Sequence, residues 1–227
     1  MKKLHTVRDR PDTHRPNAQM NKSIHFENFF QPLPPPPRTL VHPKNICPIF
    51  ALIMTPAQAL ALIDNPPIRH LTQPTRWADL GCGSGLFTLT LAGLLQPESI
   101  IYAVDRHPAI DQQMTANQVS IQPQKNDFVK KDLGLRDLDG ILMANSFHYV
   151  KDKPALLKTL KAILRPTHFF LIVEYDRTKP VPVWVPYPLG LAALQSLFHA
   201  AGYQTITCLG QMPSAFGGSN LYGAIIR

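Results

Sequence analysis

The stretch WADLGCGSGLF, residues 77–87, places three glycines at alternate positions between an apolar run and an amphipathic segment. Glycine has no Cβ, so the backbone can turn tightly at Gly81, let a ligand approach at Gly83 and enter a helix closely at Gly85. The N–H groups of the first helical turn are then free to bind a negatively charged group. The stretch therefore predicts a strand, a ligand-binding loop and a helix in succession.

Two carboxylates accompany this loop. Asp105 lies twenty residues after Gly85, at the end of the next apolar run, where it can accept hydrogen bonds from both hydroxyls of a ribose. Asp79 lies two residues before the first glycine and favours a ligand that bears an amino group. Dinucleotide enzymes use the spacing G-x-G-x-x-G, whose third glycine would fall at Leu86. The sequence therefore predicts a nucleoside derivative as the ligand, with a dinucleotide as the alternative.

Short apolar runs alternate with longer amphipathic stretches around the loop. The pattern predicts strands at 76–80, 100–104, 127–130, 140–144 and 169–174. It predicts helices at 56–64, 86–95, 108–118, 153–164 and 189–201. Such alternation is typical of a parallel sheet with helices on both faces. The last two apolar runs, 204–209 and 221–227, leave no room for a helix between them, so we expect them to pair antiparallel.

Residues 79–85 resemble motif I of the class I S-adenosylmethionine-dependent methyltransferases, and the resemblance extends over roughly residues 54–227. It implies an α/β, Rossmann-like fold with a seven-stranded, mostly parallel sheet, a reversed last strand and helices on both faces. It also implies S-adenosyl-L-methionine as the cofactor. In that family the acid that matches Asp79 and the backbone around Gly81 and Gly83 hold the methionine moiety, and Asn145 would face the same end of the cofactor.

The resemblance places the ribose and the adenine further along the sheet. Asp105 would bind the ribose hydroxyls, and Arg106 would flank the adenine. Asp132 would meet the adenine amino group, and Asp127, which stands at the start of the strand expected at 127–130, competes for that role. The implied cofactor-binding set is Asp79, Gly81, Cys82, Gly83, Gly85, Asp105, Arg106, Asp132 and Asn145.

Acceptor-binding residues are expected after the fourth and fifth strands. His148 is the best-placed candidate for a general base, although a loop histidine can also only shape a pocket. Tyr149, Trp184 and Tyr187 are candidates for the acceptor pocket, because aromatic side chains suit an apolar or planar acceptor. The sequence at 145–148, Asn-Ser-Phe-His, differs from the Asn/Asp-Pro-Pro-Tyr/Phe motif of adenine and protein amide N-methyltransferases. It also contains no cysteine that could attack a pyrimidine ring. We predict no metal site.

The first 53 residues differ in composition from the rest. They hold nine of the 23 prolines, none of the twelve glycines, and eight lysines or arginines against three acidic residues. We expect residues 1–45 to be disordered, either as an extension without function or as a docking tail. Thr55, Pro56 and Gln58 form a helix-start signature, so we predict a domain at 54–227 and hypothesise that Met54 is the native start.

The remaining composition limits the class of protein. Cys47, Cys82 and Cys208 form no paired framework, no export signal or membrane span is evident, and a cytoplasmic enzyme is expected. The net charge of +8 is concentrated in the first 53 residues, so we do not expect nucleic-acid binding by the domain. We predict methyl transfer to oxygen, nitrogen or carbon of a small molecule. The alternatives are an RNA or protein methyltransferase and a non-catalytic S-adenosylmethionine-binding module.

Overall fold

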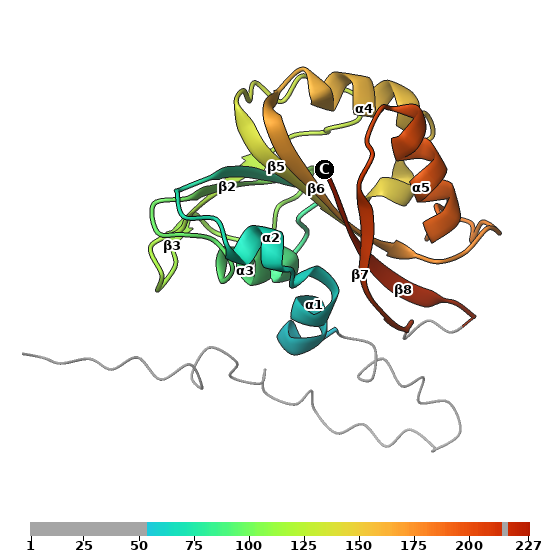
Figure 1. Ribbon diagram of the computed structural model, residues 1–227, viewed down its shortest axis with the longest axis horizontal. Coiled ribbons are helices and arrows are strands. Elements are labelled where there is room, and N and C mark those ends of the chain that lie inside the picture. Colours follow the sequence, from blue (N-terminus) through green and yellow to red (C-terminus); the bar gives the residue numbers. More distant parts are fainter. Residues whose placement is uncertain (1–53, 215–217) are drawn as a thin grey trace, which may run out of the picture. The chain divides into compact units, whose positions relative to one another are not determined.

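The computed structural model describes residues 54–214 and 218–227, which build a sheet of eight strands in the order β3-β4-β2-β1-β5-β6-β8-β7 (Figure 1). Neighbours from β4 to β6 pair in parallel, and β8 pairs antiparallel with both β6 and β7. The expected mostly parallel sheet with a reversed last strand is confirmed, but the described residues form eight strands and not the expected seven, because β3 was not expected. The strands are β1 (Arg76–Leu80), β2 (Ile100–Asp105), β3 (Gln113–Met114), β4 (Ser120–Lys125), β5 (Leu138–Ala144), β6 (Leu164–Tyr175), β7 (Ile206–Pro213) and β8 (Asn220–Ile226).

Helices pack on both faces of this sheet, and in Figure 1 α4 and α5 lie on the other side from α1, α2 and α3. They are α1 (Pro56–Ile63), α2 (Pro66–Arg69), α3 (Leu86–Ala92), the 3-10 turn η3 (Phe147–Tyr149), α4 (Lys153–Lys161) and α5 (Leu191–Ala200). The expected capping box of α1 is present: Thr55 and Gln58 each accept a hydrogen bond from the other's backbone N–H. None of the helices in the described ranges is long and apolar enough to span a membrane.

Two apolar clusters fill the spaces between sheet and helices. One joins α1 and α3 to the sheet through residues such as Leu62, Leu91 and Trp77. The other joins α4 and α5 to the opposite face through residues such as Leu157 and Phe198. Both clusters draw on successive residues of the same strands, because side chains alternate across a strand. The central strands are therefore buried on both faces, as their near-continuous apolar sequences suggest.

The crossover between β2 and β4 differs from the prediction. A helix was expected at 108–118, but this segment is a loop that contains the two-residue strand β3. Its apolar residues are too sparse for a buried stripe, since Ile110 is only partly buried and Met114 is 63% exposed. The third parallel strand is β4, not the expected 127–130. Pro123 obscured it, and the structure tolerates this proline because β3 pairs only with the first two residues of β4.

The parallel strands bring distant segments to one edge. The carboxyl ends of β1, β2, β4, β5 and β6 meet at the same edge, and the loops that follow them lie side by side. The candidate site residues follow β1, β2, β5 and β6, with Asp132 lying further beyond β4. Residues 1–53, which include the segment 1–45 expected to be disordered and Cys47, lie outside the described residues, whereas the candidate start Met54 is described.

Candidate active site

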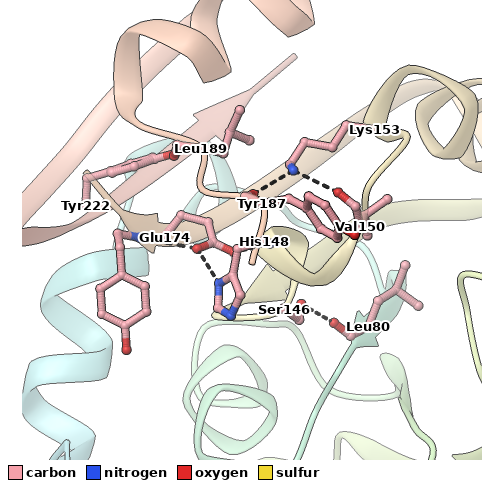
Figure 2. Close-up of polar contacts among 10 residues, drawn as sticks. Leu80, Ser146, His148, Val150, Lys153, Glu174, Tyr187, Leu189 and Tyr222 are labelled. Atoms are coloured by element: carbon pink, nitrogen blue, oxygen red, sulfur yellow. Dashed lines mark hydrogen bonds and ion pairs between the residues drawn. The ribbon is translucent and has the colours of Figure 1, made fainter. Parts of the chain in front are cut away.

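The glycine loop, residues 81–85, connects the end of β1 to the start of α3. The N–H groups of Gly81 and Cys82 both donate to Val104 O of β2, at 2.8 and 3.1 Å. Gly81 has φ +88°, and a Cβ there would overlap Cβ of Ser146, whose hydroxyl donates to Leu80 O (Figure 2). Gly81 thus lets the loop after β5 pack directly on the end of β1.

Asp79 is a buried acid with one unsatisfied oxygen. Its Oδ2 accepts a hydrogen bond of 2.5 Å from the Thr88 hydroxyl of α3. Its Oδ1 is buried and has no hydrogen-bond partner within the described residues. Burial raises the pKa of Asp79 to about 7; the bond from Thr88 opposes this rise, and the charge of Asp105 adds to it. A donor that entered beside Oδ1 would relieve this cost.

Asp79 lines a cavity of about 290 Å³. Half of its lining comes from the predicted set, namely Asp79, Gly81, Cys82, Gly83 and Asn145. Gly83 borders open space, because a Cβ built there would meet no atom within 4 Å. Cys82 is buried, and burial together with Asp79 raises the pKa of its thiol to about 12, so it is a neutral packing residue and not a nucleophile.

Asp105 ends β2 beside this cavity. Its carboxylate accepts hydrogen bonds from the N–H groups of Gly83, at 3.1 Å, and His107, at 2.8 Å. Gly85 precedes α3 at its N-cap position, as expected. Arg106 is exposed. The structure therefore joins Asp105 and Gly85 to the glycine loop, while Arg106 faces solvent.

The two candidates for the adenine lie at different distances from the strand edge. Because β4 ends at Lys125, Asp127 follows that strand and does not precede it, and its neighbour Phe128 packs near Gly81. Asp132 lies seven residues beyond β4, is exposed and forms an ion pair of 3.6 Å with Arg136. The expected order of strand and acid was wrong, because the strand itself was placed too late.

His148, in the loop after β5, and Glu174, near the end of β6, form a buried pair. His148 Nδ1 lies 2.8 Å from Oε2 of Glu174, and the His148 backbone N–H donates to Oε1 at 3.0 Å (Figure 2). The two side chains are only 2% and 0% exposed. Since a carboxylate only accepts, Nδ1 carries the proton, and in the neutral imidazole Nε2 is then an acceptor. Nε2 is buried and has no partner within the described residues.

His148 lines a second cavity, of about 410 Å³. The other lining residues come from the ends of β5 and β6, the loop after β6 and the loop after β7: Asn145, Tyr149, Tyr175, Arg177, Val181, Trp184, Val185 and Ser214. Asn145 lines both cavities, and it has φ +53° with its Oδ1 buried and unpartnered within the described part of the chain. The two cavities therefore share the residue that follows β5.

Comparison with known proteins agrees with this geometry. A family model described as a methyltransferase domain matches residues 49–208. The chain belongs to this family of methyltransferases. No curated protein matches the chain significantly.

Solved structures share the fold of this methyltransferase. The 1,6-didemethyltoxoflavin-N1-methyltransferase of Burkholderia thailandensis is 21% identical, with a TM-score of 0.57 over 76% of this chain and 77% of that one. A SAM-dependent methyltransferase of Aquifex aeolicus is 18% identical, with a TM-score of 0.50 over 77% and 98%. One from Methanosarcina mazei is 17% identical, with a TM-score of 0.51 over 73% and 97%. The S-adenosylmethionine-dependent methyltransferase fold expected from the sequence is confirmed.

The three aromatic candidates of the methyltransferase take different positions. Tyr149 and Trp184 line the second cavity and are 50% and 61% exposed. Tyr187 does not line it. Instead its backbone N–H donates to His148 O at 3.0 Å, and its carbonyl accepts from Lys153 Nζ at 2.8 Å (Figure 2). The backbone of Tyr187 thus fixes the loop after β6 beside His148.

Sequence reasoning missed two residues of the methyltransferase. Glu174 stood inside a predicted strand, and its signal was an acid in an otherwise apolar run, which needs a partner when it is buried. Lys153 at the start of α4 donates to Val150 O and Tyr187 O, both at 2.8 Å, and burial lowers its pKa while the charge of Glu174 opposes this. No local pattern marked Lys153. Among the described residues, no group of three or more His, Cys, Asp or Glu is placed to hold a metal ion.

Proposed function

We propose that this methyltransferase transfers a methyl group from S-adenosylmethionine to a small molecule whose accepting oxygen or nitrogen carries a proton. The single observation that supports the proposal is Asn145, which lines both the glycine-loop cavity and the cavity that His148 also lines. When bound, S-adenosylmethionine supplies an electrophilic methyl group. The chain's own residues need to hold the two reactants in line across Asn145 and to accept the proton that is lost.

The cofactor assignment rests on unsatisfied oxygens and on open space. Oδ1 of Asp79 and Oδ1 of Asn145 are buried and accept no hydrogen bond from any described residue, so donors such as the ammonium group of a methionine moiety suit them. The open space at Gly83 allows close approach to the backbone. We assign the methionine end of the cofactor to Asp79, Asn145 and the loop backbone at Gly81, Cys82 and Gly83.

We assign the ribose to Asp105, which ends β2 and already positions Gly83 through a hydrogen bond. For the adenine we propose Asp127 in place of Asp132. Asp127 follows β4 at the edge where the parallel strands end, and Phe128 beside it packs near the glycine loop. Arg106, exposed next to Asp105, stays assigned to the adenine side.

His148 is proposed as the general base, and Glu174 as the residue that positions it. Glu174 accepts from Nδ1–H, which favours the neutral tautomer whose Nε2 carries the lone pair, in a side chain that lines the cavity. Nε2 can then hold the proton released by the accepting atom, and the negative charge of Glu174 balances the imidazolium that results. Burial of both side chains keeps water from taking their hydrogen bonds.

The second cavity supports a small acceptor over an RNA or protein. Its volume of about 410 Å³ and its mostly apolar and aromatic lining are typical of sites that enclose a small molecule. A cytoplasmic location is proposed with it, because Cys82 and Cys208 both lack a disulfide in the structure, which suits a reducing compartment.

The cofactor assignment is tested by calorimetric titration of the full chain with S-adenosylhomocysteine. Asp105→Ala should weaken binding by about 1.5 to 3 kcal/mol, because hydrogen bonds to a charged group are lost. Asp111→Ala, on the exposed loop before β3, is the matched control and should bind like the wild type. Equal binding by Asp105→Ala, or binding of NADH instead, would contradict the assignment.

Catalysis is tested by screening hydroxylated and nitrogen-containing small molecules for release of S-adenosylhomocysteine. Turnover that depends on one acceptor class supports the proposal. Binding of S-adenosylhomocysteine without turnover on any acceptor would favour a non-catalytic binding module, and turnover on RNA alone would favour the nucleic-acid alternative.

A further inference from the structure

The aromatic side chains that line the second cavity indicate the shape of its ligand. The rings of Tyr149 and Tyr175 flank the His148 imidazole, with centroids 4.3 and 5.9 Å from it. Trp184 contributes a third large ring to the lining although it is 61% exposed. Large aromatic side chains that stay exposed around a concave site are suited to cover a flat ligand, since rings stack with little loss of conformational freedom. The cavity therefore favours a planar acceptor.

Arg177 indicates the charge of the ligand. It lines the same cavity two residues beyond the end of β6. Its Nε–H donates to Lys179 O at 2.9 Å, which holds the guanidinium in one orientation. Arg177 forms no ion pair with any described residue, and the carboxylate of Glu174, near the end of β6, is bound by His148. The carboxylate of Asp176 instead accepts from the backbone N–H of Leu191.

An oriented guanidinium without an acidic partner is matched by an anionic ligand group. Arginine binds carboxylates through two parallel hydrogen bonds, because the planar fork of its nitrogens fits the two carboxylate oxygens. In this cavity the remaining lining is apolar, aromatic or neutral once His148 is unprotonated. A carboxylate on the acceptor would thus neutralise the one cationic side chain of the lining among the described residues.

We propose that the acceptor is an aromatic hydroxy acid, with its ring among Tyr149, Tyr175 and Trp184, its carboxylate on Arg177 and its hydroxyl at His148 Nε2. This rests on the methyl transfer proposed above. The step balances: the hydroxyl oxygen forms a bond to the methyl carbon, and the carbon–sulfur bond of the donor breaks with its electron pair left on sulfur. The hydroxyl proton passes to His148 Nε2. A phenolic hydroxyl needs such a base, because it is mostly protonated at neutral pH.

The test compares 2-, 3- and 4-hydroxybenzoate with the three matching hydroxybenzamides. Each probe is titrated calorimetrically into the full chain saturated with S-adenosylhomocysteine. The three isomers cover different separations between hydroxyl and carboxylate, and the amides keep the ring and the hydroxyl while removing the charge. At least one acid should bind about tenfold or more tighter than its amide, because it alone pairs with Arg177.

Two variants test whether the preference for the acids over the amides depends on Arg177. Arg177→Gln should bring the affinities for the acid and its amide close together, whereas Lys179→Gln, which removes an exposed neighbouring charge, should keep the preference. Equal affinity for acids and amides in the wild type, a preserved preference in Arg177→Gln, or no binding by any of the six probes would overturn the proposal. The binding of S-adenosylhomocysteine is measured in the same samples, so failure of the acceptor class is distinguished from failure of the cofactor site.

Discussion

The two cavities that share Asn145 are built in different ways. The cavity proposed for the cofactor is lined mostly by one continuous stretch, 79–87, which presents backbone and glycines. The cavity proposed for the acceptor is lined by side chains of three separate segments: the loop after β5, the end of β6 with the loop that follows it, and the loop after β7. The backbone of the glycine loop suits a ligand that stays the same, such as a cofactor. The side chains that line the second cavity can be substituted without altering the glycine loop. Under the proposed assignment, binding of the cofactor and choice of the acceptor are therefore separable.

Substitution of His148 should impair methyl transfer without impairing cofactor binding. His148→Asn keeps an N–H near the position of Nδ1 for Glu174 but removes Nε2, so kcat should fall about 100- to 1,000-fold. The affinity for S-adenosylhomocysteine should stay within about twofold of the wild type, because the glycine loop is untouched. Steady-state methyl transfer with the acceptor found by screening, together with calorimetry, measures both.

Glu174→Gln examines the positioning role of the carboxylate in the same assay. The amide no longer favours Nδ1–H, so kcat should fall about 10- to 100-fold with little change in the KM of the acceptor. A rise in KM with an unchanged kcat would mean that Glu174 only maintains the shape of the cavity.

The next effect concerns the backbone of the cofactor side. Gly81→Ala should lower the free energy of unfolding by about 2 to 4 kcal/mol, since its Cβ would overlap Ser146 and its φ is positive. Gly83→Ala is the matched variant. It also has a positive φ but meets open space, so it should cost only about 1 kcal/mol while weakening cofactor binding. Urea unfolding of both proteins measures the difference, and equal losses would refute the close packing at Gly81.

These contrasts explain which parts of the fold were predictable. The glycine spacing at 81–85 and the final antiparallel pair were evident in the sequence, because each depends on local conformation or on chain length. The helix expected at 108–118 does not form, because tertiary packing and not helix propensity determines the secondary structure of such weakly amphipathic segments. β4 was missed because Pro123 is tolerated only where a neighbouring strand stops short, which no local pattern reveals.

The candidate site divides in the same way. Asp79, Gly83 and Asp105 could be named from spacing, and they lie together around the glycine loop. Glu174 could not be paired with His148 beforehand, because the pair depends on β5 and β6 being neighbours in the sheet. Misplacing one strand also reversed the order of β4 and Asp127.

A smaller effect tests the charge of the cofactor side. The pKa of Asp79 is raised to about 7 by burial, so the carboxylate is mostly protonated below that pH in the unliganded protein. If the ionised form holds the ammonium group of the cofactor, affinity for S-adenosylhomocysteine should rise about tenfold from about pH 6 to about pH 8. Calorimetry across this range measures it, and Asp79→Asn should lose the dependence. A wild-type affinity that does not vary with pH would exclude this contact.

The smallest effect examines how the acceptor side is held. Lys153→Met leaves Val150 O and Tyr187 O without their donor, so stability should fall by about 1 to 2 kcal/mol and the KM of the acceptor should rise a few-fold. Lys158→Met, on the exposed face of α4, is the control and should change neither. Thermal unfolding and steady-state kinetics measure the two effects; an unchanged KM would mean that the loop after β6 does not need this contact.

The most direct test of separable sites is one calorimetric series with S-adenosylhomocysteine at about pH 8. Wild type, Asp79→Asn and His148→Asn are titrated side by side. The structure predicts that Asp79→Asn weakens binding about tenfold or more, because a buried charge contact is lost, while His148→Asn binds within about twofold of the wild type. Equal weakening by both variants, or weakening by His148→Asn alone, would contradict the division of the active site at Asn145.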